Sequence, residues 1–254
     1  MNETPNSGDR MRSVLVVVAT IATIAFNFLA GTGRLNGVMT NEVSDKYPTV
    51  LTPAGYAFSI WGLIYFGLVA FTIYQLLPSK LERLRNVRTF YIVSCVLNCA
   101  WLYAWHSYAI GLCVILILAL LATLALINIK LKNADSARDA LFTKAPFGIY
   151  FGWVTAASIV NFVIYLRSVD VQMSASAWNT LGCIFIAAAL IAAVIVRVKL
   201  RNFLYPLAVA WASTGIAIEQ QGNTAIILAC AICVIFCLVL SISFVMDLKS
   251  MSHE

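Results

Sequence analysis

Positive charge is distributed along this chain in a pattern that few folds can accommodate. Fourteen of the seventeen Lys and Arg residues lie in the two tails and in alternate gaps between eight apolar runs. The runs are residues 13–30, 54–77, 89–106, 109–129, 146–166, 177–196, 203–218 and 223–246. Most of them reach the roughly 17 to 25 residues that a helix needs to cross a bilayer. Because cytoplasmic loops retain Lys and Arg, the pattern predicts an all-α, multi-pass membrane helix bundle of about eight transmembrane helices with both termini cytoplasmic.

The composition supports a membrane protein without a soluble domain. Apolar residues make up 61% of the chain and charged residues 11%, whereas about a quarter of a soluble domain is charged. The longest polar stretch is the external loop 31–53, so any activity must reside in the bundle or in that loop. The net charge of +6 reflects orientation. We expect no nucleic-acid partner, we expect membrane lipid at the basic loops, and we favour the plasma membrane over an organelle membrane.

Catalytic chemistry finds little support in the apolar runs. Ionisable groups inside a membrane usually mark proton relays or catalysis, yet Glu219 and His106 lie only at run ends, and the seven cysteines have the character of packing residues. No nucleophile has a base at helical spacing, and no carboxylate pair shares a helix face. The sequence therefore predicts no enzyme activity, no catalytic residue, no metal ligand and no resident cofactor.

Aromatic and amide side chains instead follow one helical face of three runs. These stripes include Phe58, Trp61 and Tyr65 in the second run, Asn98, Trp101 and Trp105 in the third, and Trp153, Ala157 and Asn161 in the fifth. An aromatic stripe alone is more often packing, but an amide in lipid must find partners and should face the bundle interior. The stripes predict an intramembrane cavity for a flat, largely apolar molecule with a few polar groups.

Three short motifs on these stripes resemble the TspO and translocator protein family, the tryptophan-rich sensory proteins (TspO/MBR). Pro53-Ala54-Gly55-Tyr56-Ala57-Phe58, followed by Trp61 and Tyr65, is similar to the family's Pro-Pro-x-Trp-x-Phe and Trp-x-x-Leu-Tyr at the start of helix two. Leu97-Asn98-Cys99-Ala100-Trp101 resembles Leu-Asn-x-x-Trp of helix three, and Trp153 to Asn161 keeps the Trp-Val, Ala and Asn spacing of helix five. Ala54 and Tyr56 stand where the family has Pro and Trp.

The resemblance implies a divergent member of this five-helix family with three extra C-terminal helices. The expected domains are a tail at 1–12, a TspO-like five-helix bundle at 13–168 with loop 31–53 as its lid, a three-helix extension at 169–247 and a tail at 248–254. Family members bind porphyrins and related tetrapyrroles, and some bind sterols, between helices one, two, three and five. Carried over by position, with Trp105 added from its stripe, the expected ligand-binding residues are Tyr56, Phe58, Trp61, Tyr65, Asn98, Trp101, Trp105, Trp153, Ala157 and Asn161.

Three functions remain open from the sequence. The first is a membrane receptor or sensor for a tetrapyrrole, a sterol or a similar amphipathic molecule. The second is a transporter of a small lipophilic metabolite, although no internal repeat or intramembrane carboxylate supports ion-coupled transport. The third is an assembly factor that docks through its C-terminal helices. A homodimer is compatible with each of them.

Overall fold

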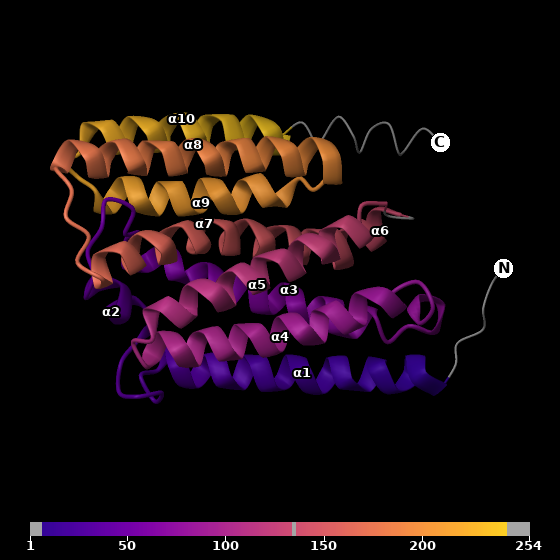
Figure 1. The fold of residues 1–254 in the computed structure, drawn as a ribbon. Coiled ribbons are helices and arrows are strands. Elements are labelled where there is room, and N and C mark those ends of the chain that lie inside the picture. The colour runs from indigo at the N-terminus through magenta and orange to yellow at the C-terminus, as the bar shows by residue number, and fades with distance from the viewer. Residues whose placement is uncertain (1–6, 134–135, 243–254) are drawn as a thin grey trace. The chain divides into compact units, whose positions relative to one another are not determined.

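The computed structural model describes residues 7–133 and 136–242, which form helices joined by turns (Figure 1). The long helices are α1 (Ser7–Gly31), α3 (Ile60–Tyr74), α4 (Arg85–His106), α5 (Ile110–Lys130), α7 (Ala145–Ser168), α8 (Ala175–Leu200), α9 (Leu204–Glu219) and α10 (Thr224–Ile242). Short elements are α2 (Thr40–Asp45), α6 (Ala137–Asp139), the 3₁₀ turns η1 (Gly55–Ser59) and η2 (Pro78–Lys80), and the π-helical turn η3 (Ala140–Lys144). The described residues contain no strand, and the predicted all-α class is confirmed.

Every predicted apolar run coincides with a helix, because a chain in hydrocarbon must satisfy its backbone hydrogen bonds internally. Seven of the described helices are long and apolar enough to cross a membrane. The seventh predicted run, residues 203–218, forms α9, which has only 16 residues and extends about 24 Å, less than the ~30 Å of hydrocarbon. Most of α9 is buried, whereas α8 and α10 expose Ile184, Ile191, Leu228 and Ile232.

The described chain divides into two compact units. Unit 1 contains residues up to 40 together with 61–147, and unit 2 contains 41–60 together with the residues from 148 onward. In unit 1, α4 packs against both α1 and α5, and in unit 2, α8, α9 and α10 pack against one another (Figure 1). The predicted division at residue 168 follows chain order and stays a prediction. The two units are defined by which residues pack together and not by their order in the chain. The backbone passes from one unit to the other at 40–41, 60–61 and 147–148.

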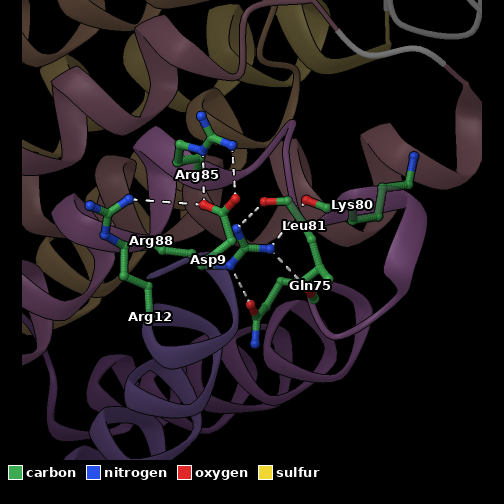
Figure 2. Close-up of polar contacts among 7 residues, drawn as sticks. All are labelled: Asp9, Arg12, Gln75, Lys80, Leu81, Arg85 and Arg88. Carbon is green, nitrogen blue, oxygen red and sulfur yellow. Dashed lines mark hydrogen bonds and ion pairs between the residues drawn. The ribbon is translucent and has the colours of Figure 1, made fainter. Parts of the chain in front are cut away.

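One end of unit 1 is tied together by a buried polar cluster (Figure 2). Asp9 of α1 is fully buried and accepts two hydrogen bonds of 2.8 Å from the guanidinium of Arg85. Arg88, also fully buried, donates from Nε to Gln75 Oε1 at 2.7 Å, and Gln75 Nε2 donates to the Ser13 carbonyl at 3.1 Å. These contacts join α1, the residues after α3 and the first turn of α4. The two arginines donate hydrogen bonds to the buried oxygens of Asp9 and Gln75. Because the donors are charged, these hydrogen bonds are stronger than those between neutral groups.

A second buried carboxylate lies in the same unit. Asp139 of α6 is fully buried, lies 3.5 Å from Lys80 Nζ, forms an ion pair with Arg83 and accepts a 3.1 Å hydrogen bond from the Tyr74 hydroxyl. The hydrogen bond with the Tyr74 side chain, assisted by the negative charge of Asp139, raises the pKa of Lys80. Lys80 therefore remains a cation over the whole physiological range, and its charge contributes to the basic loop predicted from the sequence.

Unit 2 contains a close contact between α7 and the start of α9. Gly148 and Gly152 lie one turn apart on α7. A methyl group on Gly152 would lie 2.5 Å from the Tyr205 carbonyl oxygen, and one on Gly148 would lie 2.0 Å from Asn202 Oδ1. Only glycine permits this approach, which is typical of small residues spaced four apart in membrane helices.

Candidate ligand-binding site

Four aromatic side chains of α3 and α4 form a continuous ladder in unit 1. The rings of Trp61 and Tyr65 are stacked with centroids 5.6 Å apart and an interplanar angle of 16°. Trp61 also contacts Trp101, at 6.4 Å and 31°. Trp101 stacks on Trp105 at 5.6 Å and 26°. The ladder exists because positions three and four apart lie on one helix face, and here the faces of two helices meet.

An amide chain runs beside the ladder. The Tyr65 hydroxyl donates to Asn27 Oδ1, and Asn27 Nδ2 donates to Asn98 Oδ1 at 2.8 Å. Asn98 is fully buried, and its Nδ2 donor has no hydrogen-bond partner among the described residues. A buried amide donor without a partner costs roughly 1–3 kcal/mol. The arrangement therefore places one buried, unpartnered N–H beside the aromatic ladder.

The first half of the predicted lid lies against the C-terminal end of α4, next to this group. The Trp105 indole N–H donates to the Thr40 carbonyl at 2.9 Å. Asn36 Nδ2 donates to the His106 carbonyl and to the Ser107 hydroxyl, both at 3.2 Å. Asn36 adopts φ of 56°, a left-handed conformation that asparagine tolerates better than most residues. Residues 31–40 are thus anchored on the end of α4 that carries Trp105.

The other five predicted site residues lie in unit 2. Phe58 contacts Trp153 edge-on, with centroids 6.0 Å apart. Asn161 Nδ2 donates to the Ala157 carbonyl one turn earlier on α7, at 2.9 Å. Tyr56 is 41% exposed, and its ring meets the edge of Trp211 at 5.4 Å. The structure therefore brings together Trp61, Tyr65, Asn98, Trp101 and Trp105 in unit 1 and pairs Phe58 with Trp153 in unit 2, and a single site containing all ten residues stays a prediction.

Helix α9 holds the segment that carries Tyr56 and Phe58. The Ala54 amide donates to the Gly215 carbonyl at 3.0 Å, and the Trp211 indole N–H donates to the Ala57 carbonyl at 2.9 Å. A methyl group on Gly215 would lie 2.8 Å from the Ala57 Cβ, so the two backbones are in close contact. One C-terminal helix therefore positions the motif that precedes α3.

Two of these features were not anticipated from the sequence. Asn27 lies in the first apolar run, and the rule that an intramembrane amide needs partners could have identified it, but no aromatic stripe accompanies it. Trp211 lies in α9, beyond the motif-bearing residues. Its contact with Tyr56 and Ala57 joins positions more than 150 residues apart, and no local pattern encodes such a contact.

Apolar helices long enough to span a membrane define a polytopic integral membrane protein, and an aromatic and amide cluster lies on two of them. A family profile described as TSPO-like protein matches residues 13–244, and the chain belongs to this family. The match extends beyond the motif-bearing residues and includes α8, α9 and α10. Neither the search of curated proteins nor the search of solved structures found a match.

Proposed function

We propose that this protein is a membrane receptor or sensor that binds a flat amphipathic molecule, either a porphyrin or related tetrapyrrole or a sterol. The observation that carries the proposal is the ladder of Tyr65, Trp61, Trp101 and Trp105 beside the unpartnered amide of Asn98. Membership of the TSPO-like family supports a ligand-binding role. Aromatic faces stack on a planar apolar ligand, and a single buried donor fixes the position of a polar group on it.

A titration of the purified full-length protein with protoporphyrin IX tests this proposal. The shift of the porphyrin absorption band measures binding without depending on the number of tryptophans, and cholesterol is tested as a competitor. We expect saturable binding by the wild type and about tenfold weaker binding by Trp101→Leu and Asn98→Leu, because tenfold corresponds to ~1.4 kcal/mol, about the worth of one such contact.

Tyr103→Leu is the matched control. Tyr103 lies on the same helix as Trp101 but is 58% exposed on another face, so its removal should leave porphyrin affinity unchanged. Absence of saturable binding of either ligand, or equal binding by wild type and all three variants, would mean that the ladder serves helix packing alone.

A further inference from the structure

The loop between α1 and α2 contains the only Asn-Gly pair of the chain, Asn36-Gly37. Both residues are exposed. Both also have a positive φ, 56° at Asn36 and 75° at Gly37. These angles are typical of an Asn-Gly tight turn, because glycine has no Cβ to clash there and asparagine tolerates the left-handed region. The pair is therefore a turn that water reaches.

The side chain of an asparagine that precedes glycine can react with the backbone of that glycine. The amide nitrogen of Gly37 attacks Cγ of Asn36 and forms a C–N bond. The bond from Cγ to Nδ2 breaks, and Nδ2 takes up the amide proton and leaves as ammonia. The product is a cyclic imide. Water then adds to one of the imide carbonyl carbons and opens the ring to aspartate or isoaspartate, so that nothing is oxidised or reduced.

The surroundings of Gly37 leave the attacking nitrogen accessible. Its backbone amide donates no hydrogen bond to any residue that the structure describes. A methyl group built on Gly37 would meet no atom within 4 Å, so the space beside the nitrogen is open. Asn41 differs in both respects, because it lies in helix α2 and precedes Glu42, whose side chain crowds the amide. Asn36 is therefore the more reactive of the two asparagines.

The group that would be lost is the one that anchors this loop. Asn36 Nδ2 donates to the His106 carbonyl and to the Ser107 hydroxyl, both at 3.2 Å, the long end of the hydrogen-bond range. An ionised aspartate has no donor in place of Nδ2, and its carboxylate would repel the His106 carbonyl oxygen. Isoaspartate also adds a carbon atom to the main chain. Either product removes the contact of Asn36 with the His106 carbonyl.

We propose that Asn36 is a site of spontaneous deamidation, and that its modification releases residues 31–40 from the C-terminal end of α4. The chemistry needs only water, and it is independent of ligand binding at the aromatic ladder.

Mass spectrometry of the purified full-length protein, sampled during incubation in neutral buffer, tests the reaction. Trypsin cuts after Arg34 and Lys46 and yields one peptide that contains both Asn36 and Asn41. We expect Asn36 to deamidate at least about tenfold faster than Asn41, which corresponds to a barrier lower by ~1.4 kcal/mol. Equal rates at the two asparagines, or no conversion of Asn36, would overturn the proposal.

Two glycine substitutions test the role of the attacking amide. Gly37→Ala should slow deamidation of Asn36 about tenfold, because a Cβ crowds the nitrogen and raises the barrier by ~1.4 kcal/mol. Gly33→Ala is the matched control, since Gly33 lies in the same loop with φ of 70° and does not follow asparagine. It introduces the same backbone strain and should leave the rate unchanged. Equal rates in these two variants would also contradict the proposal.

Hydrogen exchange tests the release of the loop. Asn36→Asp reproduces one product, and we expect the amides of residues 31–40 to exchange about tenfold faster than in the wild type, which corresponds to ~1.4 kcal/mol of local stability. Asn36→Gln keeps the amide and lengthens the side chain, and its exchange should lie between the two. Wild-type exchange in Asn36→Asp would show that deamidation leaves the loop in place.

Discussion

A few charged residues stabilise the end of unit 1 that contains Asp9 and Arg85. Asp9 is fully buried between cations that need its charge: Arg85 binds both of its oxygens, and Arg12 Nη1 lies 3.9 Å from Oδ1 (Figure 2). We predict that Asp9→Asn lowers the free energy of unfolding by about 2–3 kcal/mol, because it leaves cations without their counter-charge. Arg85 keeps 22% of its side chain exposed, so water compensates part of the loss.

Thermal unfolding of the purified protein measures this effect, and a decrease of several degrees in the midpoint is expected. The matched control is Glu82→Gln, which makes the same change of charge in the loop before α4, where Glu82 forms no ion pair with any residue that the structure describes. Equal shifts in the two variants would show that net charge, and not the Asp9 to Arg85 contact, determines the stability of this end.

The C-terminal end of helix α9 anchors residues 49–57, which lie far away in the sequence. Gln220 Nε2 donates to the carbonyls of Thr49 and Thr52 at 3.0 and 3.3 Å. We predict that Gln220→Leu accelerates amide hydrogen exchange of residues 49–57 about tenfold, because each lost hydrogen bond is worth ~0.5–1.5 kcal/mol and local opening governs exchange.

Hydrogen exchange followed by mass spectrometry compares this variant with Gln221→Leu, which changes the adjacent exposed side chain. The Gln221 variant should exchange like the wild type over residues 49–57. If both variants or neither of them accelerated exchange there, the Gln220 side chain would not be what anchors the loop.

The helices themselves were predictable, and much of the packing was not. Apolar length and backbone satisfaction in lipid predict α1, α4, α5, α7, α8 and α10 directly from the sequence. Helical spacing also predicts that Trp101 and Trp105 share a face with Asn98. The burial of Arg88 was not predictable, because α4 begins at Arg85, four residues before the apolar run, and its first turn carries polar partners. The contacts of α9 and Gln220 with residues 49–57 join distant parts of the chain. The spacing of apolar residues along the sequence does not predict such contacts.

For the whole molecule, the distribution of positive charge predicts a topology that can be measured. Cysteines introduced at Thr32 and Gln221 should react with a membrane-impermeant maleimide on intact cells, and cysteines at Ser79 and Lys199 only after permeabilisation, because Lys- and Arg-rich loops stay in the cytoplasm. If Gln221→Cys reacted only after permeabilisation, α9 would not cross the membrane, and the eight-helix topology with both termini cytoplasmic would be wrong.

The contact between α9 and the segment before α3 also concerns the order in which the chain is made. Thr49 and its partner Gln220 are separated by 171 positions. At a synthesis rate of about 5–20 residues per second, roughly ten to thirty seconds pass between their emergence from the ribosome. Helices α3 to α8 are synthesised during that interval, while Leu51 and Ala54, both buried in the complete structure, lack the helix that they contact. The contacts of residues 49–54 with α9 therefore form only after nearly the whole chain has been synthesised.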